Sequence, residues 1–334
     1  MNRSLKLSIV SGDAFSFESD VLVLKHAQSL YGLDRAAHAK LQNHGIKFEL
    51  PYINKDIIVD THGALRSSKI LFIGVKPLRQ FLYPEIREFS RRALVSLAQQ
   101  RGKTRHIAFT IHGTGYGLDE TEAFESELAG IVDAVTDGTF PHSIESIAFV
   151  ESDSGRVERL SRSLMKLFPT GNIAINGKSS ISSLTVESQD TLRTAGYSAA
   201  GKPHVFVAMP FSAEMDDIYH YGIQGAVNAS GLLCERSDLS AFAGDVMEWV
   251  KARISSAKLV VADLSSANPN VYLEVGYAWG CRVPTVLLVK DAQDLKFDIK
   301  GQRCLVYNTI KNLEESLRHE LQMLGRPLHV HGLF

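Results

Sequence analysis

The sequence is short of cysteine, of long apolar runs and of net charge, and each shortage excludes a class of protein. Only three of the 334 residues are cysteine, and they are widely spaced, which argues against a disulfide framework or a zinc site and favours a reducing compartment. No apolar run approaches the roughly 20 residues of a membrane-spanning helix, and the N-terminal apolar run is too short for a secretory signal. The formal net charge is −1, so the chain lacks the excess of positive charge that is typical of nucleic-acid-binding proteins. We therefore expect a cytoplasmic protein whose partners are small molecules rather than membranes or nucleic acids.

The twelve histidines do not supply a metal site either, because no pair has ligand spacing on a clear helix. We expect no metal and no cofactor. The overall composition, 45% hydrophobic and 22% charged, is ordinary for a globular protein. A chain of this length favours two domains over one.

The first 170 residues alternate between strand-like and helix-like patterns. "SDVLVLKH", "SSKILFIGVKP" and "TRHIAFTIHG" read as strands, and "YPEIREFSRRALVSLAQQRG" reads as an amphipathic helix that begins near a proline and ends at a glycine. Such alternation predicts an α/β domain with a mostly parallel sheet over residues 1–170. Residues 171–202 lack a sustained period and are rich in Ser, Gly, Thr and Ala, which predicts a linker.

Residues 203–334 alternate again and predict a second α/β domain of ordinary size. In open parallel sheets, ligands bind beyond the carboxyl ends of the strands. Asp263 ends the apolar run "KLVVADLS", and Glu274 begins the helix that follows it. If the strand ends converge, Asp263, Glu274 and Asp245 surround one pocket.

Carboxylates at such an edge suit the cleavage of a C–N glycosidic bond, which places positive charge on the sugar. One carboxylate near the anomeric carbon stabilises that charge or adds to it, and a second acid protonates or binds the base. The structural alternative is that Glu274 stabilises a helix N-terminus and that Asp263 caps the same turn. The spacing alone favours the two interpretations about equally.

A resemblance favours the catalytic interpretation. The segments "VFVAMPFS", "DDIYHYGIQGAV", "ADLSSANPNVYLEVGYAWG" and "PTVLLV", in this order, resemble the nucleoside 2-deoxyribosyltransferase-like family, which is distantly related to NAD-cleaving TIR domains. The resemblance covers Pro203 to about Tyr307 and implies a flavodoxin-like or Rossmann-like parallel sheet. It also implies that Glu274 is the nucleophile and that Asp245 orients the base or acts as the acid.

The same resemblance implies a set of substrate contacts, namely Met209, Pro210, Phe211, Ser266, Asn268 and Asn270. It further implies a composite pocket in a homo-oligomer. The "NPNVYLEVGYAWG" version departs from the transferases proper, so hydrolysis is favoured over transfer to a second base. The substrate stays open between a nucleoside, a nucleotide and NAD.

The first half contains a Gly-rich loop, "HGTGYG", between a strand and a helix. Backbone N–H groups in such a loop suit a diphosphate, although a tight strand-to-helix turn has the same composition. The order "IVSGD", "DVLVL", "IAFTIHGTGYG" resembles the macro domain, with a mixed sheet between helical layers. The resemblance implies that Asp13 contacts adenine and that Gly113, Thr114, Gly115, Tyr116 and Gly117 wrap the phosphates of ADP-ribose.

The macro-like half departs from the hydrolases of its family. Their Asn-containing stretch is replaced by "LKHAQSLYGLD", so we expect a binder, or a purely structural domain, rather than a second hydrolase. Two three-layer α/β domains then suggest a nucleotide sensor joined to an N-glycosidase effector, of the kind used in antiphage or stress signalling. The alternative is a signalling module in which both domains bind nucleotides and neither is catalytic.

Overall fold

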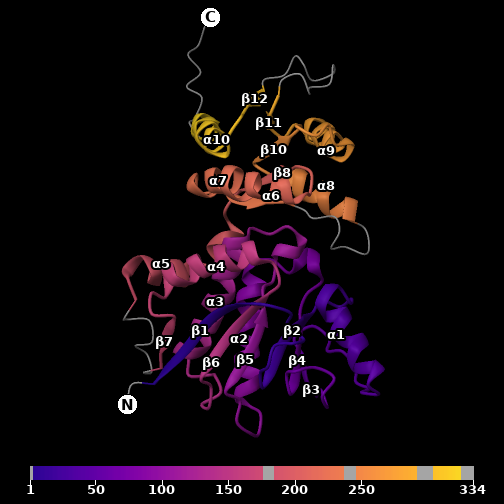
Figure 1. Cartoon of the computed structure of the whole chain (residues 1–334), viewed down its shortest axis with the longest axis vertical. Coiled ribbons are helices and arrows are strands. Elements are labelled where there is room, and N and C mark those ends of the chain that lie inside the picture. Colours follow the sequence, from indigo (N-terminus) through magenta and orange to yellow (C-terminus); the bar gives the residue numbers. More distant parts are fainter. Residues whose placement is uncertain (1–2, 176–183, 237–245, 292–303, 325–334) are drawn as a thin grey trace, which may run out of the picture. The chain divides into compact units, whose positions relative to one another are not determined.

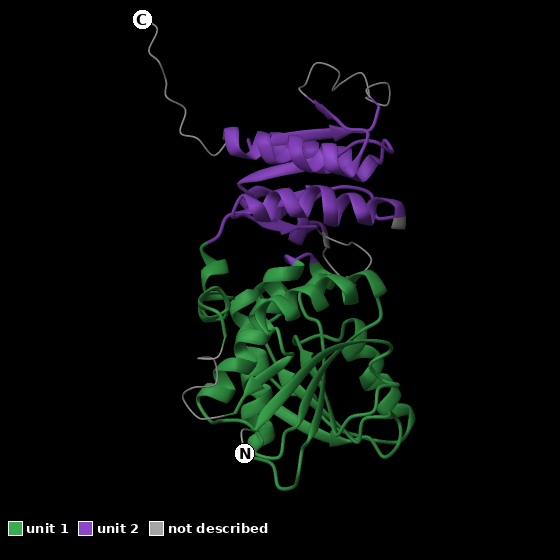
Figure 2. Cartoon of the chain, turned by 60° about the vertical axis from the view of Figure 1, so that its left-hand side comes forward, with its two compact units in different colours: residues 1–116, 120–201 green, residues 117–119, 202–334 purple. Residues whose placement is uncertain are grey.

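The computed structural model describes residues 3–175, 184–236, 246–291 and 304–324. The chain divides into two compact units, which Figure 2 colours separately. Unit 1 comprises Met1–Tyr116 and Glu120–Gly201, and unit 2 comprises Gly117–Asp119 and Lys202–Phe334. Each unit contains one β-sheet flanked by helices (Figure 1), which confirms the predicted α/β class with two separate sheets. No helix in the described part of the chain is long and apolar enough to cross a membrane.

The sheet of unit 1 is mixed and has the strand order β3-β4-β2-β5-β6-β1-β7. Its outer strands β3 and β7 are antiparallel to their neighbours, whereas the strands between them are parallel. The strands are β1 (Ser4–Ser11), β2 (Val21–His26), β3 (Asp56–Asp60), β4 (Lys69–Gly74), β5 (His106–Thr110), β6 (Ser146–Glu151) and β7 (Asn172–Ala174). The helices are α1 (Gly32–Asn43), η1 (Leu78–Gln80), α2 (Tyr83–Ala98), η2 (Thr114–Tyr116), α3 (Glu120–Thr136), α4 (Ser154–Leu167), α5 (Val186–Thr194) and η4 (Ser198–Ala200).

Alternation along the strands builds two cores in unit 1. Leu22 and Leu24 of β2 join Leu41 of α1 in one buried cluster. On the other face, Phe109 of β5 contacts Phe89 of α2 with ring centroids 6.2 Å apart. Because successive side chains of a strand point to opposite faces, the sheet lies between two helical layers.

The segment for which the sequence predicts a linker contains regular structure. β7 pairs with β1, and α5 and η4 belong to unit 1. Buried Arg87 of α2 donates through Nη1 to the backbone oxygens of Leu192, Arg193 and Ala195 at 3.0, 3.1 and 2.7 Å. It also forms two hydrogen bonds with Asp133 of α3, at 2.7 and 2.8 Å. One guanidinium therefore fixes the C-terminal end of α5 onto unit 1.

Unit 2 has a fully parallel sheet with the order β12-β11-β10-β8-β9. Counted from β8, this is the flavodoxin-like order 2-1-3-4-5, as the resemblance implied. The strands are β8 (His204–Ala208), β9 (Leu233–Glu235), β10 (Leu259–Asp263), β11 (Thr285–Val289) and β12 (Cys304–Val306). The helices are α6 (Ala213–Asp217), η5 (Ile218–Gln224, wound as a π-helix), α7 (Gly225–Ala229), α8 (Val246–Ser256), α9 (Pro269–Gly280) and α10 (Ile310–Leu324).

The two faces of this sheet are covered by different helices. Val205 and Val261 pack with residues of η5, α7 and α10, whereas Phe206 and Ala262 pack with residues of α8 and α9. Gly222 of η5 allows α10 to approach closely, because a Cβ at this position would lie 2.7 Å from Leu313 Cδ2. Strands covered on both faces explain the continuous apolar runs of the sequence.

Candidate functional site

The strand order of unit 2 places a topological switch point between β8 and β10. The chain runs from β8 outward to β9 and then returns to the other side of β8 to form β10. The connections on the two sides therefore leave the sheet in opposite directions, and ligands bind at such switch points beyond the carboxyl ends of the strands. The loop from Met209 follows β8, and the loop from Leu264 follows β10 and leads into α9.

Glu274 occupies a core-facing position of α9. Val271, Val275 and Ala278 of the same helix are buried against the sheet. With Glu274 they complete the i, i+3, i+4, i+7 stripe that an amphipathic helix turns towards its core. An acid therefore takes the place of an apolar residue in this stripe, and the helix sets its position.

The carboxyl of Glu274 is half-buried and has no partner among the residues that the structure describes. No hydrogen bond or ion pair joins it to another described residue, and burial raises its pKa to about 7. A carboxyl that is removed from water resists ionisation until a positive charge approaches it. Such a group stabilises a positively charged transition state better than a solvated carboxylate does, because little water must be displaced.

Asp263 takes a different role from Glu274. It is fully buried, its Oδ2 accepts a hydrogen bond from Tyr307 Oη at 2.6 Å, and its Oδ1 accepts one from the Ser265 backbone N–H at 2.9 Å. Tyr307 and Val261 belong to the core on the α10 side, so Asp263 points to the sheet face opposite α9. Burial raises the pKa of Tyr307, and the Asp263 carboxylate raises it further. These bonds fix the loop after β10 and support a structural role for Asp263.

The helix-cap function that the sequence suggested for Asp263 belongs to Asn268. The Asn268 side chain is the N-cap of α9, and its Oδ1 accepts from the Asn270 N–H at 2.9 Å. Pro269 follows in the first helical turn, where a missing N–H has no cost. Ser266 and Asn270 are both exposed. Of the predicted sugar or phosphate contacts, Asn268 therefore already has an intramolecular partner.

The loop after β8 is apolar and contacts Arg236, a residue that the sequence pattern did not predict for the site. Met209 is buried, Pro210 half-buried and Phe211 41% exposed. Arg236, directly after β9, lies with Cζ 5.1 Å from the Phe211 ring centroid, and its Nη1 is 3.9 Å from Met209 Sδ. The signal in the sequence was an arginine within the short extended run "LLCERSD", directly after its apolar residues. The third predicted acid, Asp245, lies outside the described residues.

Asp13 of unit 1 follows the carboxyl end of β1 and is exposed. Its Oδ2 accepts from Ser16 Oγ at 2.7 Å and its Oδ1 from the Phe15 N–H at 3.3 Å. The hydrogen bond from Ser16 is the main cause of a lowered pKa. Asp13 is therefore an ionised acceptor that also shapes its own loop.

The Gly-rich loop after β5 is a tight turn around η2. Gly113 and Gly117 adopt φ values of +98° and +94°, which only glycine adopts without strain. Gly115 is exposed and Thr114 half-buried, whereas Tyr116 is buried and donates from Oη to the Phe81 carbonyl at 3.1 Å. The tyrosine side chain therefore anchors the loop, and Thr114 and Gly115 are the residues that it leaves accessible.

Two buried polar side chains, His112 and Glu127, lie in the core beside this loop. The His112 ring packs edge-on against Phe89 with centroids 4.5 Å apart. Within the described part of the chain, His112 Nε2 and both carboxylate oxygens of Glu127 have no hydrogen-bond partner. Burial lowers the pKa of His112 well below its usual value and raises that of Glu127 well above it. Burial thus disfavours charge on both side chains.

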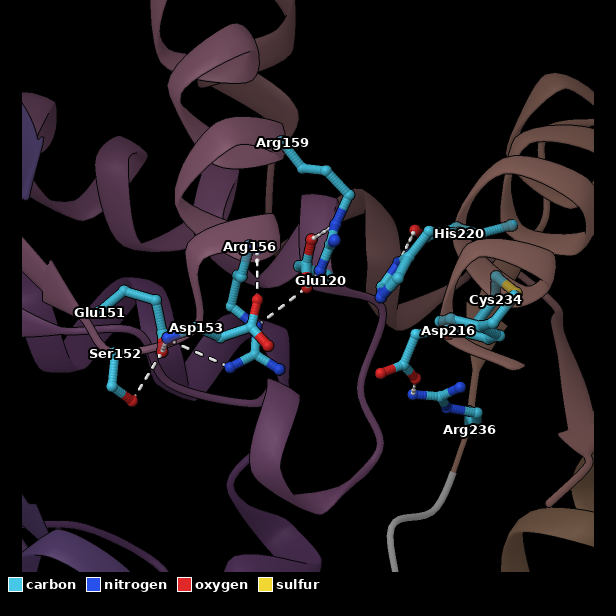
Figure 3. Close-up of polar contacts among 12 residues, drawn as sticks. Glu120, Glu151, Ser152, Asp153, Arg156, Arg159, Asp216, His220, Cys234 and Arg236 are labelled. Atoms are coloured by element: carbon cyan, nitrogen blue, oxygen red, sulfur yellow. Dashed lines mark hydrogen bonds and ion pairs between the residues drawn. The ribbon is translucent and has the colours of Figure 1, made fainter. Parts of the chain in front are cut away.

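The helix that follows the loop begins at a buried ion-pair network, drawn in Figure 3. Glu120, at the start of α3, accepts from Arg156 Nε at 3.0 Å and from Arg159 Nε at 2.8 Å. Arg156 also pairs with Glu151 at the end of β6. The network ties α3, α4 and β6 together and so fixes the point at which the Gly-rich loop becomes a helix.

Strand β2 and helix α1 contribute a buried ion pair to unit 1. Lys25 Nζ lies 3.3 Å from Asp34 Oδ2. Burial raises the pKa of Asp34, although Lys25 opposes the shift. No group of three His, Cys, Asp or Glu side chains among the described residues has the arrangement of a metal site.

Comparisons with known proteins give similarities in fold but define no family. No protein-family model matches the sequence, and no curated protein matches it. An Oceanobacillus iheyensis macrodomain mutant with ADPR is 19% identical, with a TM-score of 0.39, over 50% of this chain and 100% of that chain. A Trypanosoma brucei macrodomain in complex with ADP-ribose is 18% identical, with a TM-score of 0.39, over 48% of this chain and 69% of that chain.

A further similarity is to the Clostridium botulinum CMP N-glycosidase. It is 17% identical, with a TM-score of 0.29, over 34% of this chain and 98% of that chain. At these identities and TM-scores, the similarities assign neither a family nor an activity to the chain.

Proposed function

We propose that the chain is an N-glycosidase whose unit 2 cleaves the bond between a sugar and a base through Glu274. The single observation that supports this proposal best is the placement of Glu274. Its half-buried carboxyl, without a partner in the described part of the chain, stands in the core-facing stripe of α9, the helix that follows β10. A purely structural acid would gain a partner or face water.

The proposed reaction follows from the charge at the sugar. As the C–N bond breaks, its electron pair goes to the base nitrogen, which takes up a proton, and positive charge grows on the anomeric carbon. The Glu274 carboxylate stabilises this charge or bonds to the carbon, and water then supplies the hydroxyl group and releases a proton. Asp245 is the proposed acid for the base, and Asp263 holds the edge of the site through Tyr307 and Ser265.

We further propose that unit 1 binds an ADP-ribose-like ligand and thereby regulates unit 2. Asp13 supplies an ionised acceptor for adenine, and the accessible backbone of Thr114 and Gly115 faces the phosphates. Regulation requires that the ligand prefer one conformation or assembly of the chain over another. A role in antiphage or stress signalling, and a homo-oligomeric state, belong to the same proposal.

The glycosidase proposal is tested by base release from a panel of nucleosides, nucleoside monophosphates and NAD, with and without ADP-ribose. We expect release by the full-length protein and a loss of at least about a thousandfold in Glu274→Gln, because the charge at the anomeric carbon would lose its partner. Glu248→Gln is the matched control, since Glu248 on α8 is exposed and paired with Lys251. No release by wild-type protein from any member of the panel would contradict the proposal.

The binding proposal is tested by calorimetry of the full-length protein with ADP-ribose. We expect binding by wild-type protein and a clear loss of affinity in Asp13→Ala, because a charged acceptor contributes about 1.5–3 kcal/mol. Lys40→Ala removes a neighbouring exposed charge and serves as the control. Equal affinity in wild-type protein and Asp13→Ala would exclude the role proposed for Asp13.

A non-catalytic nucleotide-binding module is the second candidate. It is favoured by the internal hydrogen bonds of Asp263 and Asn268, which engage two of the predicted site residues in the fold itself. Under this alternative Glu274→Gln leaves ligand affinity in place and no variant releases base.

A further inference from the structure

Arg236 lies at the carboxyl edge of the unit 2 sheet, where its side chain is mostly buried against two aromatic rings. Its side chain is 14% exposed. Its Cζ lies 4.1 Å from the ring centroid of Tyr219 and 5.1 Å from that of Phe211. Contacts with aromatic rings fix a guanidinium without engaging any of its N–H donors.

The donors of Arg236 are only partly used within the described part of the chain. Nη2 donates to Asp216 Oδ1 at 3.0 Å (Figure 3), and the described residue nearest to Nη1 as an acceptor is Met209, whose Sδ is 3.9 Å away. A thioether is a weak acceptor, and a guanidinium carries five N–H donors in one plane. As far as the described residues go, the positioned cation therefore keeps hydrogen-bonding capacity for a further acceptor.

Arg236 lies at the carboxyl edge of the sheet, the edge at which open parallel sheets bind ligands. It directly follows β9, and its neighbours Met209 and Phe211 belong to the loop after β8, on one side of the switch point. Planar, paired N–H donors suit the oxygens of a phosphate, which a guanidinium binds through two hydrogen bonds. A neutral sugar hydroxyl or a base would not require a full positive charge here.

We propose that Arg236 binds the phosphate of the substrate, so that unit 2 acts on nucleoside phosphates rather than free nucleosides. This inference rests on the proposed function, because it assigns the substrate class of the same site. Asp216 is 48% exposed and orients the guanidinium, but its negative charge repels a phosphate. Arg236 and Asp216 therefore affect phosphate-bearing substrates with opposite signs.

The test compares a nucleoside with its 5′-monophosphate in full-length protein. We expect wild-type protein to prefer the monophosphate. Arg236→Gln lowers kcat/KM for the monophosphate by about 10- to 100-fold, mainly through KM, and leaves the nucleoside nearly unchanged. Arg236→Lys restores part of the difference, because it keeps the charge without the paired donors.

Asp216→Asn supplies the second arm, and Arg318→Gln the matched control. Asp216→Asn keeps a hydrogen-bond acceptor but removes the repulsion, so KM for the monophosphate falls several-fold. Arg318 is paired with Glu314 on α10, and its loss changes neither substrate. If Arg236→Gln affects both substrates equally, or neither, the inference is wrong, because a merely structural tie between β9 and α6 would not discriminate.

A binding measurement separates this inference from the proposed function. Calorimetry in the Glu274→Gln background compares the monophosphate and the nucleoside with and without Arg236→Gln. Loss of the phosphate preference on removal of Arg236 supports the inference even where no base is released. Glu274-dependent base release without any phosphate preference overturns the inference and leaves the glycosidase proposal in place.

Discussion

Glu274 shows at the residue scale how much of a side chain's environment a local pattern predicts. An acid between apolar residues on a helix predicted a special environment, and the structure places it in the core-facing stripe with a pKa of about 7. The same local pattern could not show that Asp263, unlike Glu274, is held by hydrogen bonds within the fold. The partner that engages Asp263 is Tyr307, 44 residues further along the chain, and only the parallel arrangement of the strands brings the two together.

The raised pKa of Glu274 makes a prediction for stability that needs no substrate. A carboxyl whose pKa rises from 4.5 to about 7 on folding favours the folded state fully below pH 4.5 and loses that contribution as the pH rises through about 7. The shift corresponds to about 3 kcal/mol. Glu274→Gln should therefore raise the thermal stability of the full-length protein at about pH 8 and change it little at about pH 4.

The control for this stability measurement is Glu248→Gln on α8. Its exposed side chain is paired with Lys251, so we expect at most a small change at either pH. A Glu274→Gln variant that is less stable than wild-type protein at about pH 8 would show that the carboxylate has a stabilising partner.

At the scale of elements, the two sheets differ in how well the sequence pattern of their strands predicted the strand directions. The unit 2 strands carry continuous apolar runs, and their parallel arrangement was predicted from these runs and the resemblance. In unit 1, β3 and β7 are antiparallel edge strands. Their short sequences contain no signal of direction, because direction depends on where the connecting segment crosses the sheet. The helix cap at Asn268 was also not predicted, because the resemblance implied that this residue contacts the substrate.

Asn268 permits a test that separates capping from substrate binding. Asn268→Ala removes the acceptor for the Asn270 N–H and should cost about 1 kcal/mol of unfolding free energy, measured by denaturant titration. Asn268→Asp keeps the capping oxygen and should retain the stability. Loss of activity in Asn268→Asp together with unchanged stability would instead assign this side chain to the substrate.

At the scale of the whole molecule, residues 171–202 are the segment where the prediction from composition differs from the structure. Their richness in Ser, Gly and Thr predicts a linker, yet the described residues within this range carry β7, α5 and η4 and belong to unit 1. Strand β7 pairs with β1, and the buried Arg87 of α2 bonds to three carbonyls at the end of α5 and to Asp133. Composition reports only local preference, whereas this contact joins residues more than a hundred positions apart.

Arg87→Lys tests that anchor. A lysine retains the charge but cannot reach Asp133 and three carbonyls at once, so we expect a loss of about 2–4 kcal/mol in unfolding free energy. Limited proteolysis should become faster within residues 184–201. Arg91→Lys is the control, since Arg91 on the same helix pairs with Glu88 three residues away. Unchanged proteolysis in Arg87→Lys would mean that other contacts hold the segment.

The most direct test of the account is the pH dependence of kcat/KM for base release by the full-length protein, between about pH 5 and pH 9. If the Glu274 carboxylate stabilises the charged sugar, the rate should rise about tenfold per pH unit below about pH 7 and level off above it. Glu274→Gln should release no base across this range. A rate that is flat or falls through pH 7, or a Glu274→Gln variant that keeps the wild-type profile, would contradict the assignment of Glu274 as the catalytic carboxylate.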